Sequence, residues 1–209
     1  MNAAPAPIPC VLLAGGRASR LGGGDKPLRM IGGVSILARI VAQLRPQCSE
    51  LVISANGDPA RFAEFGIPVL ADALDGFKGP LAGILAGLDW TAAHHPGTKW
   101  MASVTADTPV LPDDLIARLY AARAADNADL AVASSGGRRH HAVALWSIAL
   151  RDDMRRALCV EDNRGVGQFA ARHRVAVAEW PAEPRDPFFN INTADDLAHA
   201  ERLASFDHG

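Results

Sequence analysis

The chain has 209 residues, a length that fits one domain with a sizeable core. Hydrophobic residues make up 49% and charged residues 21%, which is typical of a globular protein and excludes a disordered one. The formal net charge of −2 argues against a general attraction to nucleic acid or to an anionic membrane, so we expect neither as a partner.

Cysteine spacing and the first residues bear on where the protein works. Cys10, Cys48 and Cys159 lie far apart and show no zinc-ligand pattern, which favours a reduced, cytoplasmic setting. Residues 1–9 are rich in Pro and Ala and lack the apolar segment of a secretory signal, so we expect them to be flexible. No apolar run approaches the ~20 residues of a membrane-spanning helix.

In the first half of the chain, short apolar runs alternate with helical patterns. The expected strands are Val11–Ala14, Leu51–Ser54, Val69–Leu70 and Met101–Thr105. The expected helices run from the capping residue Ser35 to Pro46, over Ala60–Phe65, over Leu81–Thr91, and from Pro112 to Ala124. This alternation predicts an α/β, three-layer sandwich whose mostly parallel sheet has helices on both faces.

The second half is less regular. Leu130–Ser134 and Ala142–Trp146 are expected strands, joined across "SGGRRHH" as an antiparallel excursion, and Val175–Trp180 is one more strand. The segment "NTADDLAHAERLASF" opens with a Thr193/Asp196 capping-box pattern and predicts a final helix. Without an internal repeat or linker, residues 1–209 are predicted to form a single domain.

A glycine-rich and basic loop leaves the first expected strand. Val11–Leu28 reads "VLLAGGRASRLGGGDKPL", with five glycines and the basic residues Arg17, Arg20 and Lys26. Glycines let backbone N–H groups approach an anion, and the cations would neutralise a polyphosphate. The loop matches neither GxxxxGK[ST] nor GxGxxG, and an ordinary surface loop is the alternative. We expect it to bind a nucleoside triphosphate, with Lys26 and Arg20 stabilising charge on the phosphates during transfer.

Three polar residues follow expected strands at their carboxyl ends: Asn56, Asp72 and Asp107. In an open parallel sheet these ends meet at one crevice. Asp107, in "TADTP", would face the basic loop, and Mg²⁺ prefers one or two carboxylates together with phosphate oxygens. The alternative for all three is a turn-starting role.

The motif "LAGGRASRLGGGDKPL" resembles LAGGxSxRMGxxDKxL, the signature of nucleotidyltransferases with a nucleotide-diphospho-sugar transferase-like Rossmann fold. The similarity is greatest to the molybdenum cofactor guanylyltransferases. It extends over nearly the whole chain through "SANGD", "GPLAGILAGL", "TADTPVLP" and "NINTADDL". The resemblance implies transfer of GMP from GTP to the terminal phosphate of molybdopterin, with release of pyrophosphate.

The resemblance also implies a set of site residues. Asp107 matches the family's magnesium ligand, and Asn192 is the candidate for a second metal contact. Asn190 and Asn192 would offer amides to the acceptor or the metal. The positions implied for nucleotide or acceptor binding are Leu13, Ala14, Gly15, Gly16, Lys26, Asn56, Asp72, Gly83, Asp107, Asn190 and Asn192. Gly83 has a packing role as its alternative, because glycine inside a helix often marks the close approach of a neighbour.

Several alternatives stay open from the sequence. A cytidylyltransferase for the same cofactor, or a sugar-phosphate nucleotidyltransferase, is the nearest; Gly15, where cytidylyl enzymes tend to carry Ala, favours GTP. A non-catalytic nucleotide-binding or carrier protein and an NAD-linked dehydrogenase are less favoured. "RRHHAVALW" departs from the family's His-Pro-Val, so Arg138–His141 are expected to form a solvated hairpin tip. We expect a monomer or weak homo-oligomer that passes its product to apo-molybdoenzymes or their chaperones.

Overall fold

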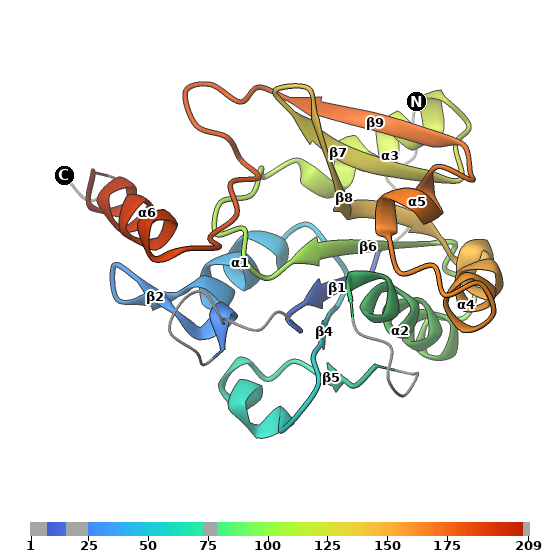
Figure 1. The fold of residues 1–209 in the computed structure, drawn as a ribbon, viewed down its shortest axis with the longest axis horizontal. Helices are drawn as coiled ribbons and strands as arrows, with labels where there is room; N and C mark the ends of the chain where they lie inside the picture. The colour runs from blue at the N-terminus through green and yellow to red at the C-terminus, as the bar shows by residue number, and fades with distance from the viewer. Residues whose placement is uncertain (1–7, 16–24, 73–78, 207–209) are drawn as a thin grey trace.

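The computed structural model describes residues 8–15, 25–72 and 79–206, and within them a seven-stranded sheet forms the centre of the molecule (Figure 1). The strand order across the sheet is β5-β4-β1-β6-β8-β7-β9. In chain order these strands are β1 (Cys10–Leu13), β4 (Leu51–Ser54), β5 (Val69–Leu70), β6 (Trp100–Thr105), β7 (Leu130–Ser135), β8 (Arg138–Ser147) and β9 (Val175–Trp180).

The sheet is parallel except at β8. Strands β4 and β6 flank β1 in parallel, β5 continues this half, and β9 lies parallel to β7. Strand β8 runs antiparallel to both β6 and β7, as the antiparallel excursion predicted. Gly136 and Gly137 connect β7 to β8 with φ of +54° and +75°, the left-handed conformation that a tight hairpin turn requires.

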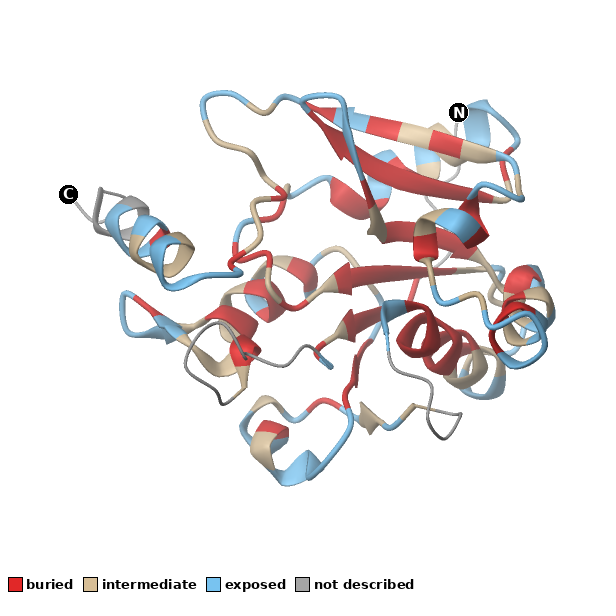
Figure 2. Cartoon of the chain, viewed as in Figure 1, coloured by how far each residue is buried: buried red, intermediate tan, exposed pale blue. Residues whose placement is uncertain are grey.

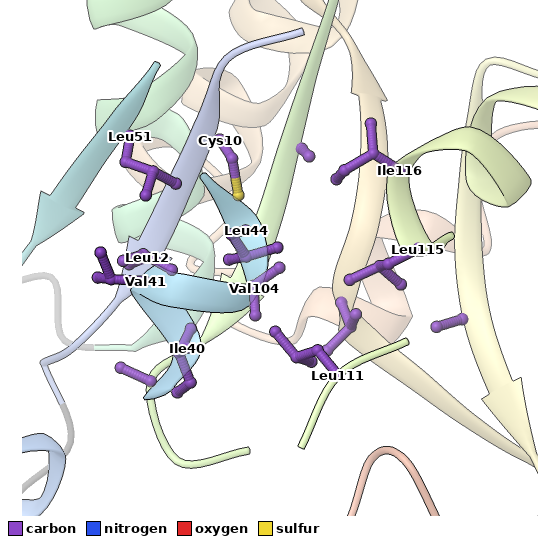
Figure 3. Close-up of a cluster of buried hydrophobic side chains, with 14 of the residues drawn as sticks. Cys10, Leu12, Ile40, Val41, Leu44, Leu51, Val104, Leu111, Leu115 and Ile116 are labelled. Atoms are coloured by element: carbon purple, nitrogen blue, oxygen red, sulfur yellow. The ribbon is translucent and has the colours of Figure 1, made fainter. Parts of the chain in front are cut away.

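Helices cover both faces of the sheet, which confirms the three-layer α/β fold. The α-helices are α1 (Ile36–Leu44), α2 (Pro80–His94), α3 (Leu115–Ala125), α4 (Arg151–Cys159), α5 (Val166–Ala170) and α6 (Ala194–Phe206). One apolar cluster joins β1 and β6 to α1 and α3, with Leu12, Leu44 and Leu115 among its residues (Figure 3). A second cluster on the other face joins the sheet to α2, α4 and α5.

Helix α2 approaches the sheet closely because two of its buried residues lack side chains. A Cβ on Gly83 would lie 2.6 Å from Ser54 Oγ, and one on Gly87 would lie 2.8 Å from Val11 Cβ. Figure 2 shows the central strands and most of α2, apart from its ends, as buried. Both glycines therefore serve helix–sheet packing, which offsets the helix propensity that they lose.

Most expected elements are present, with boundaries shifted by a few residues. Ser35 Oγ accepts a hydrogen bond from Ala38 N at the start of α1, as its capping role predicted. The expected Pro112 helix begins later, at Leu115. Helices α4 and α5, the short hairpin β2 (Met30–Ile31) and β3 (Val34–Ser35), and the 3-10 helix η2 (Lys26–Leu28) are additional to the elements predicted from the sequence. The 3-10 helix η3 (Pro59–Phe65) lies where a short helix was expected, and a third, η4 (Ile148–Leu150), precedes α4.

The first described residues pack against the sheet. Residues 1–7 of the expected flexible segment lie outside the described residues, whereas Ile8 and Pro9 are buried. The carbonyl oxygen of Ile8 accepts a hydrogen bond from Ser49 N, and that of Pro9 accepts one from Ala102 N. Among the described residues, no helix has both the length and the apolar character needed to cross a membrane.

Candidate active site

The register of the sheet places four candidate residues in one row. Leu13 of β1 lies level with Ser54 of β4 and with Thr105 of β6, and Ser54 lies level with Leu70 of β5. Gly15, Asn56, Asp72 and Asp107 each come two residues after a member of this level row. The four strands are adjacent and parallel, so the row runs Asp72, Asn56, Gly15, Asp107 along one edge, over roughly 14 Å at about 4.8 Å per strand. We conclude that the predicted strand ends meet at a single edge.

At the β6 end of the row, Lys26 joins two distant parts of the chain. Its Nζ donates to Asp107 Oδ2 at 2.7 Å and to Asn192 Oδ1 at 2.7 Å. The Lys26 and Asp107 side chains are only 11% and 22% exposed, so this ion pair is partly shielded from water. Lys26 belongs to η2, which brings the C-terminal part of the glycine-rich segment to the β6 end of the row.

The segment with Asn190 and Asn192 is hydrogen-bonded to the end of β6. Ile191 N donates to the carbonyl oxygen of Asp107 at 3.0 Å, and Thr108 Oγ1 donates to Asn190 Oδ1 at 2.7 Å. Thr108 is fully buried, and its role was not predicted although it stands within the "TADTP" motif. These contacts bring Asn190, Asn192 and Asp107 together, as the resemblance implied.

Asp196 fixes the position of Asn192 from the first turn of α6. Its Oδ2 accepts the backbone N–H groups of Asn192 and Thr193, each at 2.8 Å, while Asp196 N donates to Thr193 Oγ1 at 3.1 Å. This reciprocal pattern confirms the predicted capping box. The Asn192 N–H, then that of Thr193, lower the pKa of the Asp196 carboxyl, with Lys26 adding a smaller electrostatic effect.

At the opposite end of the row, Asn56 and Asp72 bind each other. Asn56 Nδ2 donates to Asp72 Oδ2 at 2.6 Å, and Asp72 N donates to Asn56 Oδ1 at 3.0 Å. Asn56 is exposed and Asp72 half-buried, so both side chains remain accessible to a ligand at this edge. The pair provides amide and carboxylate groups of the kind that read the hydrogen-bonding edge of a base.

The other candidate residues differ in what surrounds them. Leu13 is half-buried and Ala14 buried at the end of β1, and Ala14 N donates to the carbonyl oxygen of Ser54. A Cβ on Gly15 would meet no described atom within 4 Å, so packing against the described residues does not require glycine there. Gly83 lies against Ser54 and Leu13 in the packed interior. Gly16, Arg17 and Arg20, for which roles were predicted, lie outside the described residues.

The donor set at Asp107 and Asn192 suits a hard divalent cation. One carboxylate oxygen and one amide oxygen converge on the single Lys26 ammonium, each at 2.7 Å, so they already face one positive charge. Among the described residues no group of three or more His, Cys, Asp and Glu side chains forms a metal cluster. Mg²⁺ fits such a sparse set, because it commonly takes one or two protein ligands and completes its shell with phosphate oxygens and water.

The hairpin β7–β8 contains a buried polar cluster where a solvated tip was expected. Ser135 Oγ lies 2.8 Å from His140 Nε2 and donates to Asp186 Oδ1 at 2.8 Å. The prediction was wrong for His140, which is 9% exposed and packs against the Phe188 ring, whereas Arg138 and Arg139 are exposed. The buried contacts arise because the segment after β9 folds back over the hairpin, which sequence spacing does not reveal.

A basic residue, a carboxylate and an amide gather at the carboxyl edge of a parallel α/β sheet, which is where such folds bind nucleotides and other ligands. The family model of the MobA-like NTP transferase domain matches residues 10–179. The chain therefore belongs to the MobA-like NTP transferase family and is a nucleotidyltransferase.

Curated relatives match over nearly their full length. A molybdenum cofactor guanylyltransferase of Rhodopseudomonas palustris (strain BisB5) is 59% identical over 199 residues, covering 95% of each chain. The protein of the same name from Bradyrhizobium sp. (strain ORS 278) is 58% identical over 200 residues, covering 96% of this chain and 94% of the relative.

Among solved structures, molybdopterin-guanine dinucleotide biosynthesis protein A from Archaeoglobus fulgidus superposes with a TM-score of 0.74 at 21% identity, covering 95% of this chain and 100% of that one. A Mycobacterium tuberculosis protein solved in complex with manganese has a TM-score of 0.69 at 16% identity, with coverage of 94% and 99%. At sequence identities this low, the structural similarity is evidence for the fold alone.

Proposed function

We propose that this protein transfers GMP from GTP to the terminal phosphate of molybdopterin, forming the guanine dinucleotide cofactor and pyrophosphate. The observation that carries the proposal is the contact of Lys26 with Asp107 and Asn192 at one end of a row that has Asn56 and Asp72 at its other end. The row can take the base at the Asn56 end and the phosphates at the Lys26 end. The relatives named as guanylyltransferases support this choice of reaction.

In the proposed reaction, an oxygen of the acceptor's terminal phosphate attacks the α-phosphorus of GTP. The bond from that phosphorus to the α–β bridging oxygen breaks, and pyrophosphate leaves with the electron pair. No protein nucleophile is required, so the chain acts by positioning and by electrostatic stabilisation. We expect Lys26 to bind phosphate oxygens as their negative charge grows, with Arg20 assisting it.

Magnesium would be held by Asp107 and Asn192, where it would neutralise charge on the triphosphate. The Asn192 N–H donates to Asp196 and the Ile191 N–H donates to the carbonyl oxygen of Asp107, so the backbone at both proposed ligands is fixed before any cation arrives. Such pre-formed ligand geometry reduces the reorganisation that binding requires.

Nucleotide choice is proposed to depend on Gly15. A Cβ there would contact no described atom within 4 Å, so the described residues leave room for a purine beside Gly15. We expect Gly15→Ala to weaken GTP binding while leaving CTP binding and thermal stability unchanged. A cytidylyltransferase is the second candidate, and clearly tighter binding of CTP than of GTP by the unaltered protein would favour it.

The direct test is to mix the purified protein with GTP, Mg²⁺ and molybdopterin and to identify the product by mass. The proposal predicts the guanine dinucleotide and one pyrophosphate per product. Parallel reactions with CTP, ATP and UTP control for nucleotide choice, and Asp107→Ala controls for the site. The proposed reaction would be contradicted if intact molybdopterin gave no dinucleotide, or if Asp107→Ala formed as much product as the unaltered protein. We further propose that the enzyme works in the cytoplasm and hands its product to apo-molybdoenzymes or their chaperones.

A further inference from the structure

We infer that Arg61 is a positioning residue that keeps the base-binding and phosphate-binding ends of the nucleotide site at a fixed spacing. The inference rests on the proposed function, because it assigns the base to the Asn56 end and the triphosphate to the Lys26 end. It concerns a residue outside the recognised motifs, on the 3-10 helix η3.

The guanidinium of Arg61 joins two segments of the site. Its Nη2 donates to the backbone carbonyl oxygen of Asn56 at 2.6 Å, and its Nε lies 3.5 Å from Asp25 Oδ2. The first contact is a hydrogen bond from a charged donor, whereas the second is an ion pair without hydrogen-bond geometry. The side chain is only 25% exposed, so water screens these contacts incompletely.

Local structure directs Arg61 toward this position. Asp58 Oδ1 accepts from Ala60 N and so caps the start of η3, while the buried neighbour Phe62 anchors the helix, with the guanidinium carbon 4.8 Å from its ring centroid. Gly57 has a φ of +92°, and a Cβ there would lie 3.1 Å from Arg61 Nη1. Glycine at 57 thus permits both the turn after β4 and the approach of the guanidinium.

The two segments that Arg61 joins hold the two ends of the site. On one side, the Asn56 side chain is hydrogen-bonded to Asp72 through both its amide atoms. On the other side, Asp25 directly precedes Lys26, whose ammonium contacts Asp107. Strand pairing already fixes Asn56 relative to Asp107, whereas Arg61 links Asn56 to the η2 segment, so its loss would free Lys26 to shift relative to the Asn56 end.

A spacing role makes a specific prediction about fragments of the nucleotide. A ligand that spans two sites gains affinity only when the sites keep the distance that the ligand requires. Loss of the spacer should therefore weaken GTP while leaving the separate binding of guanosine and of tripolyphosphate nearly unchanged. If Arg61 instead contacted the base or the phosphates of the nucleotide directly, its loss would weaken binding of the matching fragment as strongly as binding of GTP.

The experiment measures the binding of GTP, guanosine and tripolyphosphate to Arg61→Met by competition with a fluorescent GTP analogue in the presence of Mg²⁺. We expect the GTP Kd to rise about tenfold, because binding one end would no longer present the other at its required distance, and each fragment Kd to rise less than twofold. Arg61→Lys keeps the charge but cannot make both contacts, so it should recover only part of the loss. The matched control is Arg45→Met, because Arg45 donates to the carbonyl oxygen of Phe65 at the other end of η3.

The outcomes separate the possible roles. Unchanged GTP binding in Arg61→Met, or a tenfold loss of either fragment, would overturn the positioning role. If Arg61→Met does not fold, Asp25→Asn tests the same connection and should show the same selective loss for GTP. Failure of the unaltered protein to bind GTP at all would instead contradict the proposed function.

Discussion

The most informative single substitution is Asp107→Asn, which keeps the shape of the side chain and removes its charge. Asp107 Oδ2 lies 2.7 Å from Lys26 Nζ, with 22% and 11% of the two side chains exposed. Breaking a fully buried ion pair by changing one partner costs about 3–5 kcal/mol. Water reaches this pair and an amide still accepts from Lys26, so we expect a smaller loss of about 2 kcal/mol. For a domain of this size that lowers the melting temperature by roughly 4–8 °C.

The functional effect of Asp107→Asn should exceed its structural effect. If the carboxylate holds the metal at the phosphates, pyrophosphate release at saturating GTP should fall about 100-fold or more, at a temperature where the variant is fully folded. The matched control is Asp89→Asn, since Asp89 also forms a short ion pair, 2.6 Å from Arg155 Nη2, but between α2 and α4. We expect the control to keep full activity. If Asp107→Asn retained more than a third of the activity in a coupled pyrophosphate assay, Asp107 would be a structural residue only.

Three further predictions test other parts of the molecule. Gly87→Ala should lower the melting temperature by about 2–6 °C in calorimetry, because the new Cβ would lie 2.8 Å from Val11 Cβ and overpacking outweighs the gain in helix propensity; an unchanged value would contradict this. Burial lowers the pKa of His140, so the unfolded chain binds a proton at this residue more readily than the folded chain does. The free energy of unfolding should therefore decrease as the pH is lowered below 6.5, and in His140→Gln this part of the pH dependence should disappear. Asp196→Asn should reduce activity a few-fold by loosening Asn192. The pKa of Asp196 is lowered in the folded protein, so the carboxylate stabilises the fold at neutral pH, and the difference in unfolding free energy between the variant and the unaltered protein should vanish as acid protonates that carboxylate.

Features set by local chemistry could be predicted from the sequence. The strands show as short apolar runs, and the capping residues Ser35 and Thr193 mark the starts of α1 and α6 because their side chains satisfy free backbone N–H groups. The placement of Asn56, Asp72 and Asp107 at one edge followed from the topology alone, since parallel strands share the direction of their carboxyl ends.

Features set by tertiary contact could not be predicted in this way. Lys26 and Asn192 stand 166 positions apart, and only the fold shows that the first donates to the second. Helix α4, "RDDMRRALC", has an amphipathic pattern, but its sequence is so polar that Met154, Ala157 and Leu158 alone are buried. Arg61 carries no motif, and its two contacts depend on how the turn at Gly57 directs η3.

Glycine shows most clearly how structure adds to a sequence pattern. Gly15, Gly83 and Gly87 all lie in conspicuous glycine motifs, yet their surroundings separate two demands on the chain. A Cβ on Gly83 or Gly87 would lie within 3 Å of a side chain in the sheet, so these positions are constrained by folding, whereas a Cβ on Gly15 would meet none of the described atoms within 4 Å. Substitution at Gly87 should therefore change stability, and substitution at Gly15 should change nucleotide binding. Gly15 also stands in the row between Asn56 and Asp107, so of the three glycines it is the stronger candidate for a nucleotide contact.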